Sequence, residues 1–252
     1  MSQAPRLPFL IKAEIFLRLF AIQGAWNYET MLGNGIAFAM EPGLRFLPGG
    51  KGGEAYRAAM ARHCTYFNAH PYLAGVAVGA LLRAELDGVP AAHVERFRTA
   101  LPGPLGSVGD RLVWAAWLPF CAVLALAAFG LGMGTAGVLL LFVGSYNAGA
   151  VTLRAWGIRA GFGRGLQVAQ VLGAPVLRQA PAHLARGMAL VAGFALPLAA
   201  RGIIGPGRTL LGATLLAALV GAAALGRFAR RSEGWRLALA LLTALVLYAM
   251  VR

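Results

Sequence analysis

The sequence is poor in charge, and above all in acidic residues. Only 13% of its 252 residues are charged and 9 are acidic, whereas 59% are hydrophobic. Soluble domains carry about 25% charged residues, so a soluble fold could not hide this much apolar surface. The shortage of charge therefore predicts a polytopic integral membrane protein.

The sequence also lacks the patterns of a self-contained enzyme. Its two cysteines, Cys64 and Cys121, fall in an amphipathic and a membrane-embedded context, so we expect free thiols. Zinc-type Cys/His spacing, a nucleophile elbow and suitably spaced carboxylate pairs are absent. We therefore expect no catalytic residue, no metal and no cofactor of its own. Residues 1–12 do not have the order of a secretory signal peptide, so we expect the N-terminus to be retained.

Long runs without charge mark the expected spans. No charged residue lies between Arg111 and Arg154, a distance sufficient for two spans of about 20 residues each, with the glycine-rich residues 130–134 as the turn. Three further uncharged runs bring the expected number of spanning helices to five: 187–200, 209–226 and 237–251.

The basic residues are concentrated between these runs. The net charge is +14, and its arginines fill the predicted connections 154–186 and 227–236, which the positive-inside rule assigns to the cytoplasm. The uncharged turn at 130–134 is assigned to the opposite side. Because arginines confined to membrane-flanking connections form no continuous basic face, nucleic-acid binding is excluded.

The first 110 residues differ from the rest. Their apolar runs are short and are interrupted by Gly, Pro and polar residues, which an isolated lipid-facing helix would not tolerate. We therefore predict an all-α fold in a single membrane domain, 1–252. Residues 1–110 form its broken-helix or re-entrant half, with an amphipathic helix at 54–67, and residues 111–252 form its spanning half.

A first polar cluster lies within the apolar run 15–38. If this segment is helical, one stripe of its surface carries Gln23, Trp26, Asn27 and Thr30. Amides donate and accept hydrogen bonds at once, and an indole can cover the apolar face of a pyranose, so the stripe suits a polyhydroxylated ligand. The alternative is that these groups form hydrogen bonds between helices.

A second cluster contains Asn68 and His70, followed by Pro71. The proline biases His70 away from helical geometry, and irregular backbone at membrane depth has to line a cavity or protein. A half-helix beginning at Pro71 would direct its free N–H groups toward Asn68 and His70, as in transporter substrate sites. The alternative is a hydrogen-bonded structural histidine.

A third cluster, residues 103–110, has glycines at every third position. It matches neither a Walker A loop nor a dinucleotide fingerprint. The simplest interpretation is a loop in which Asp110 caps the following long helix. The alternative is a gating loop shaped by Gly106, Gly109 and Asp110.

Three segments resemble the IID membrane subunit of the mannose/fructose/sorbose phosphotransferase systems: IQGAWNYETMLGNGIAFA (22–39), FNAHPYLAGVAVGALL (67–82) and GPLGSVGDRLVW (103–114). They occur in the family's order and approximate spacing. The resemblance is strongest over residues 16–156 and covers roughly the whole chain.

The resemblance implies a multi-pass subunit of the bacterial cytoplasmic (inner) membrane, in contact with membrane lipid. It implies pairing with a IIC subunit, in a trimer of IIC–IID pairs, and phosphorylation of the incoming sugar by a IIAB component. It also implies a sugar site at Gln23, Trp26, Asn27, Asn68 and His70, with the gate at Gly106, Gly109 and Asp110. Members carry no phosphorylated histidine on IID.

The function expected from this resemblance is phosphoenolpyruvate-dependent sugar uptake. The alternative is a scaffold or regulatory subunit of an incomplete system without transport.

Overall fold

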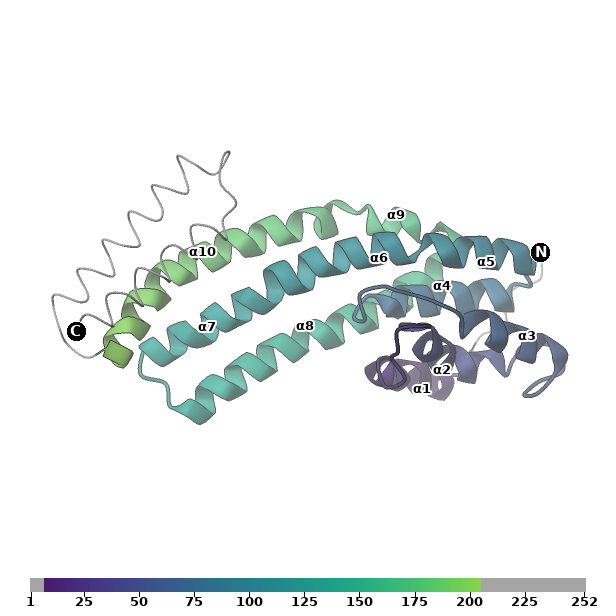
Figure 1. Ribbon diagram of the computed structural model, residues 1–252, viewed down its shortest axis with the longest axis horizontal. Coiled ribbons are helices and arrows are strands. Elements are labelled where there is room, and N and C mark those ends of the chain that lie inside the picture. Colours follow the sequence, from purple (N-terminus) through teal and green to yellow (C-terminus); the bar gives the residue numbers. More distant parts are fainter. Residues whose placement is uncertain (1–6, 205–252) are drawn as a thin grey trace.

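The computed structural model describes residues 7–204, and this range consists of helices joined by turns and short loops. Figure 1 shows an elongated molecule in which long helices lie along its length and shorter ones gather at one end. Cys64 and Cys121 are free thiols. The expected all-α fold and the expected free cysteines are confirmed.

The longest element is a helical line from Ala91 to Gly130. Its parts are α5 (Ala91–Ala100), α6 (Pro102–Gly109), a π-helical segment (Asp110–Trp117) and α7 (Leu118–Gly130). The Leu118 amide donates to the Val113 carbonyl, five residues earlier, directly before Pro119. Proline has no amide hydrogen and clashes with the carbonyl four residues before it, so the preceding turn widens.

The second long helix is α8 (Thr135–Arg164), which follows the expected turn at 130–134. Gly132 takes a φ of 92° in this turn, a value that glycine adopts at no steric cost. Within residues 7–204, two helices are long and apolar enough to cross a membrane, Ala91–Gly130 and Thr135–Gln167. They correspond to the two spans predicted from the uncharged run.

The third long helix is α10 (Pro175–Ile204), which follows a 3₁₀ turn (Gly165–Gln167) and α9 (Ala169–Leu172). It packs along the helical line Ala91–Gly130, with Gly187 against the Phe120 ring and Gly130 against Leu198. The uncharged run 187–200 is part of α10. The runs 209–226 and 237–251 lie outside the described residues, so the count of five spans stays a prediction.

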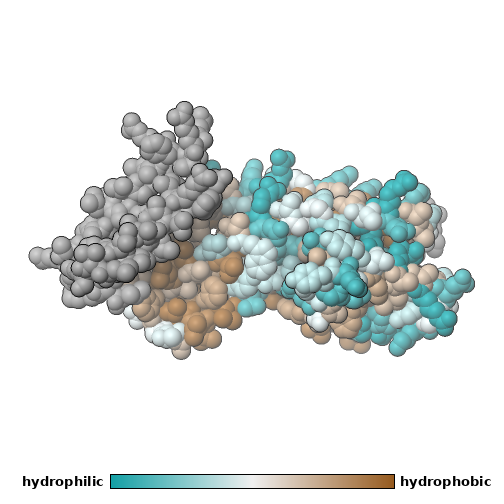
Figure 2. Space-filling view, viewed as in Figure 1, coloured by the Kyte–Doolittle hydropathy of each residue, from teal (hydrophilic) through white to brown (hydrophobic). Residues whose placement is uncertain are grey.

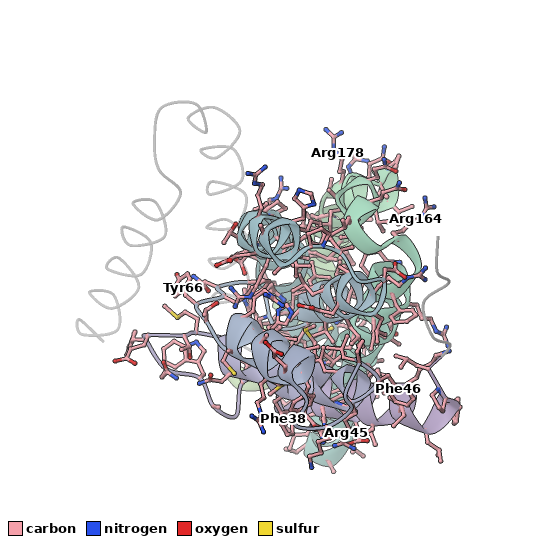
Figure 3. All side chains as sticks on the ribbon, turned by 90° about the vertical axis from the view of Figure 1, so that its right-hand side faces the viewer. Phe38, Arg45, Phe46, Tyr66, Arg164 and Arg178 are labelled. Atoms are coloured by element: carbon pink, nitrogen blue, oxygen red, sulfur yellow. The ribbon has the colours of Figure 1, made fainter. Side chains whose placement is uncertain are left out.

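One prediction about charge is wrong. The arginine-rich connection expected at 154–186 does not begin at Arg154, because α8 continues to Arg164 and carries Arg154 in a buried position. The chain leaves α8 only at Gly165, where a φ of 52° ends the helix. In the end-on view of Figure 3, Arg164 and Arg178 project on the same side of the molecule.

The N-terminal half is built of short helices, as predicted. They are α1 (Phe9–Arg18), a 3₁₀ turn (Leu19–Ala21), α2 (Gly33–Leu44), α3 (Glu54–His63) and α4 (Ala74–Leu86). The amphipathic helix expected at 54–67 is present as α3 but ends at His63. The half-helix expected to begin at Pro71 begins at Ala74 instead, because residues 71–73 form a turn.

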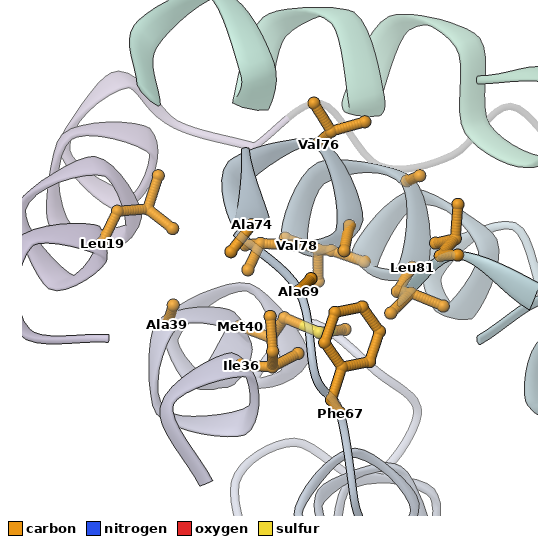
Figure 4. Close-up of a cluster of buried hydrophobic side chains, with 14 of the residues drawn as sticks. Leu19, Ile36, Ala39, Met40, Phe67, Ala69, Ala74, Val76, Val78 and Leu81 are labelled. Carbon is orange, nitrogen blue, oxygen red and sulfur yellow. The ribbon is translucent and has the colours of Figure 1, made fainter. Parts of the chain in front are cut away.

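Two kinds of contact hold this half together. Ile36 and Met40 of α2 pack with Phe67 and with Val78 and Leu81 of α4 in a dry core (Figure 4). Beside it, a charged cluster at Glu41 joins α1, α2 and α3. Its carboxylate accepts hydrogen bonds from Arg45 (2.6 and 2.8 Å), Arg18 (3.0 Å) and the Tyr56 hydroxyl (3.0 Å). The hydrogen bond from Arg45 lowers the pKa of Glu41 to about 2, against the opposing effect of burial.

The hydropathy of the surface changes along the length of the molecule. In Figure 2 apolar side chains gather over the turn between α7 and α8, and polar ones over the N-terminal helices. Large apolar side chains in this region are well exposed, including Leu131 at 76% and Leu140 at 73%. Such a surface is stable when lipid covers it.

Helices α4 and α8 approach each other through glycine. Gly75 and Gly79 on α4 lie against the backbone of α8, and Gly157 and Gly161 on α8 lie against the backbone of α4. Each pair is spaced four residues apart, so both fall on one helix face. Small residues at this spacing let two backbones pack closely where a Cβ would separate them.

We expect Gly79→Ala to lower the melting temperature of the purified protein. The added Cβ would lie 2.5 Å from the Ile158 carbonyl oxygen and 2.6 Å from the Phe162 amide nitrogen, and overpacking of this kind costs about 1–3 kcal/mol. The matched control is Gly144→Ala, also within a helix, where no heavy atom lies within 4 Å of the added carbon. Equal melting temperatures in detergent would contradict the close contact.

Candidate functional site

A polar cavity of about 550 Å³ lies where three parts of the chain meet. The loop after α1 contributes Gln23 and Trp26, the segment before α4 contributes Asn68 and His70, and the helical line contributes Gly106, Asp110 and Trp114. Six of the eight residues expected in the sugar site or gate therefore line one cavity. Asn27 and Gly109 do not line it.

Backbone pairing brings the first two segments together. The Leu32 amide donates to the Phe67 carbonyl (2.9 Å), and the Phe67 amide donates to the Thr30 carbonyl (3.1 Å). The absence of a side chain at Gly33 allows this approach, because a Cβ there would strike the Thr65 carbonyl. Backbone groups 35 and 37 positions apart in the sequence are thus paired beside the cavity.

Arg98 fixes the same segment from the other side. Its guanidinium donates to the carbonyls of Thr65 (2.6 Å), Tyr66 (3.0 Å) and His63 (3.3 Å), just beyond the end of α3. These carbonyls have no intrahelical partner at a helix terminus. The buried arginine therefore holds the backbone that leads into Asn68 and His70.

The prediction that the first cluster forms a stripe on one helix face is wrong. Residues 22–30 form turns, so Gln23, Trp26, Asn27 and Thr30 do not share a helix face. The Asn27 side-chain oxygen instead accepts hydrogen bonds from the Glu29 and Thr30 amides, both at 2.9 Å, and its carbonyl accepts one from Met31. Asparagine favours such local bonds over a helix interior. Asn27 thus shapes the loop that presents Gln23 and Trp26.

His70 combines deep burial with an unused nitrogen. It is 2% exposed, and its Nδ1 accepts a hydrogen bond from the Tyr72 amide (3.2 Å), one of the free N–H groups of the turn that opens with Pro71. Its Nε2 has no hydrogen-bond partner among the described residues. Burial lowers the pKa of His70 to about 4, and the Arg154 charge acts in the same direction while Asp110 opposes it. The ring is therefore neutral at physiological pH, with Nε2 carrying the proton.

The prediction of a loop at 103–110 is also wrong. These residues belong to α6 and to the start of the π-helical segment, so Asp110 is inside a helical line and does not cap a helix. Glycines at every third position suggested a loop, but these residues continue a helix, and Pro102 and Pro104 lie in its first turn, where their missing N–H costs nothing. Gly109 packs directly on the His70 side chain, where any Cβ would collide.

An aromatic cluster below the cavity was not found from the sequence. The Trp114 and Tyr72 rings lie 5.1 and 5.2 Å from the His70 ring, and the Tyr72 hydroxyl donates to that of Tyr146 (2.8 Å). Arg154 lies over the Tyr72 ring at 4.1 Å and donates to the carbonyl oxygens of Leu19 and Ala150, both at 3.3 Å. It forms no ion pair within residues 7–204.

A sequence signal for part of this cluster did exist. Arg154 is a lone charge at the end of a long apolar run, and ionisable residues within a span face protein or a water-filled cavity. Trp114 gives no such signal, because one indole in an apolar run is ordinary. Its position beside His70 depends on the widened turn before Pro119.

The arrangement suits a neutral polar ligand. Amides at Gln23 and Asn68, a carboxylate at Asp110 and a buried imidazole face one cavity, and two half-exposed indoles flank it. Together they can donate and accept several hydrogen bonds while covering an apolar ring face. Residues 7–204 contain no group of three or more His, Cys, Asp or Glu side chains able to hold a metal ion.

Comparison with known proteins decides the family. The family described as the phosphotransferase system mannose/fructose/sorbose IID component matches residues 11–196. This chain is a member of the IID family. The match includes all three polar segments that form the cavity.

Relatives of this IID chain are found in several bacteria. The mannose-specific EIID component of Escherichia coli is 31% identical over 173 residues, which cover 66% of this chain and 59% of that protein. The fructose permease IID component of Bacillus subtilis is 31% identical over 65% of this chain and 61% of its own length. The chain therefore matches less than two thirds of the length of these relatives.

Solved structures share the fold of this IID chain. One membrane protein is similar at a TM-score of 0.65 and 26% identity, over 75% of this chain and 70% of the other. The mannose transporter ManYZ, solved by cryo-electron microscopy with a microcin, is similar at a TM-score of 0.55 and 23% identity, over 97% of both chains. The second likeness shows the fold alone.

We expect Gly109→Ala to displace His70 in this IID chain. The new methyl group would occupy the position of the His70 side chain, and the ring would move relative to Trp114. Trp114 is within reach of the ring, so the change is measurable as a shift in tryptophan emission. Gly106→Ala is the matched control, because no atom lies within 4 Å of its added carbon. Identical spectra for the two variants would contradict the contact.

The burial of His70 leads to a pH prediction. Protonation should occur near pH 4 rather than near the ordinary histidine value of about 6.5. Histidine-labelled protein followed by NMR from pH 8 to about pH 3 provides the titration curve, with His70→Gln identifying the signal. A midpoint close to 6.5 would contradict the buried, neutral ring.

Proposed function

We propose that this chain serves sugar uptake as the IID membrane subunit of a mannose-type phosphotransferase system, and that the polar cavity contacts the sugar. The observation that carries this proposal is His70, which lines the cavity, is buried, and has an Nε2 without a partner among the described residues. An unpaired buried polar atom costs about 1–3 kcal/mol, so a ligand that pairs it gains that energy.

Each lining group has a role suited to a sugar. The His70 Nε2 donates to a hydroxyl, Asp110 accepts from one or two hydroxyls, and Gln23 and Asn68 do both. Trp26 and Trp114 cover the apolar face of the ring. Asn27 supports the site by ordering its loop, and Gly109 supports it by admitting the His70 side chain.

The gate is proposed at the helical line rather than in a loop. Gly106 and Asp110 lie on the two sides of the junction between α6 and the π-helical segment. A π-helical turn is a local defect that helices often place at functional sites. A change in its pitch would rotate Asp110 and Trp114 relative to His70 and so open or close the cavity.

The transport reaction requires partners. We propose that a IIC subunit completes the sugar path, that the assembly is a trimer of IIC–IID pairs in the bacterial inner membrane, and that a IIAB component phosphorylates the sugar. Family membership supports this proposal. The chain crosses the membrane several times in this assembly, and the polar cavity lies toward its cytoplasmic, arginine-rich end.

His70→Leu and Asp110→Leu test the site. Each replaces a hydrogen-bonding side chain with an apolar one of similar size and so removes a hydrogen bond to the sugar, and the concentration for half-maximal uptake should rise about tenfold. The measurement is phosphoenolpyruvate-dependent uptake of labelled mannose, fructose or sorbose in cells that express the whole system.

Assembly is measured in parallel by co-purification with IIC. Gln170→Ala, an exposed amide on α9 away from the cavity, is the matched control and should change neither property. Unchanged uptake in both site variants would place the sugar elsewhere. Loss of co-purification with normal folding would favour a scaffold role for these residues.

A further inference from the structure

A second cavity, of about 530 Å³, lies between α1 and α8 at the arginine-rich end of the molecule. Its walls are almost entirely apolar, and its floor includes Ile15 of α1 and Leu82 of α4. This groove is separate from the polar cavity, because no residue lines both.

The two walls of the groove have the same pattern. Both place a cation next to apolar side chains at positions i, i+3, i+4 and i+7 of one helix face: Phe9, Lys12, Ala13 and Phe16 on α1, and Ala155, Ile158, Arg159 and Phe162 on α8. The groove thus presents a basic group on each side and apolar surface between them.

Lys12 and Arg159 are the two cations that line the groove. Both are exposed, and neither forms an ion pair with any described residue. Other basic side chains nearby are neutralised, among them Arg18 by Glu14 and Glu41, and Arg83 by Asp87. The groove is lined by no acidic residue, so its net charge is positive.

The position of α1 fits the boundary of a membrane. It exposes large apolar side chains, with Phe9 at 81%, Leu10 at 77% and Leu17 at 66%, while the Glu41 cluster holds the helix in place. α8 ends near the same level at Arg164. Apolar side chains with interspersed cations are typical of the interface between headgroups and acyl chains.

We propose that the groove between α1 and α8 binds an anionic phospholipid. The phosphate of the headgroup pairs with Lys12 and Arg159, and an acyl chain lies along Phe9, Phe16, Ile158 and Phe162. Basic pockets between helices at the cytoplasmic face of a membrane suit anionic headgroups for this reason. The bound lipid would join α1, and with it the loop that carries Gln23 and Trp26, to the long helix α8.

A soluble anion or a sugar fits the groove less well. Apart from the two cations, the lining contains no side chain that can form a hydrogen bond, whereas sugars need several donors and acceptors. An inorganic phosphate would satisfy the cations but leave the apolar walls uncovered. The proposal is independent of the sugar site, because lipid binding is measured without sugar and without the phosphorylating component.

The test is native mass spectrometry of the full-length protein in mild detergent, with phosphatidylglycerol or phosphatidylethanolamine of identical acyl chains added. We expect tighter binding of phosphatidylglycerol, and we expect the combined variant Lys12→Ala and Arg159→Ala to weaken it about 10- to 30-fold. The matched control combines Arg164→Ala with Arg178→Ala, two exposed arginines (Figure 3) that do not line the groove. This control should bind as the unchanged protein does.

A second variant tests the groove itself. Ala155→Trp would fill the apolar part and should weaken binding of both lipids, while melting temperatures report whether each variant folds. The proposal would be overturned if the two lipids bound equally, or if the combined variant Lys12→Ala and Arg159→Ala bound phosphatidylglycerol as tightly as the unchanged protein. Displacement of phosphatidylglycerol by millimolar inorganic phosphate would also overturn it, because the acyl chain would then contribute nothing.

Discussion

The close backbone contact between α4 and α8 is the constraint on which the rest of the structure depends. α4 begins four residues after His70, and α8 carries Tyr146 and Arg154. Because Gly75, Gly79, Gly157 and Gly161 remove the side chains between these helices, the aromatic and basic groups of α8 come directly beneath the turn that holds His70. A wider separation would remove the hydroxyl contact between Tyr72 and Tyr146.

Arg154 links this contact to the loop at the other side of the cavity. It is a buried cation that donates to the Leu19 carbonyl, just before the loop that carries Gln23 and Trp26, and it covers the Tyr72 ring. A buried charge is costly, and hydrogen bonds to carbonyl oxygens together with aromatic faces offset part of that cost. The cavity wall, the aromatic cluster and the start of the N-terminal loop are therefore coupled through one side chain.

The two cavities differ in chemistry because their walls come from different kinds of segment. The polar cavity is formed by turns, by the glycine-rich helix α6 and by the π-helical segment, where backbone and side-chain polar groups are presented to a ligand. The groove between α1 and α8 is formed by regular helix faces, where the apolar periodicity continues and each face carries one cation. A polar ligand fits the first site, and an amphiphile fits the second. Helix α1 forms one wall of the groove and leads into the loop that lines the polar cavity.

The amino-acid sequence by itself determined the membrane class, the all-α fold, the pair of long helices with their glycine turn and the family, because each depends on composition or on order along the chain. It also identified Gln23, Trp26, Asn68, His70, Gly106 and Asp110, which share one cavity. Only the tertiary structure decided that Asn27 folds its own loop, that residues 103–110 are helical, and that Arg154 is buried. Local patterns at these positions are compatible with more than one conformation. Contacts from distant segments, such as the pairing of Thr30 with Phe67 and of Gly109 with His70, select among them.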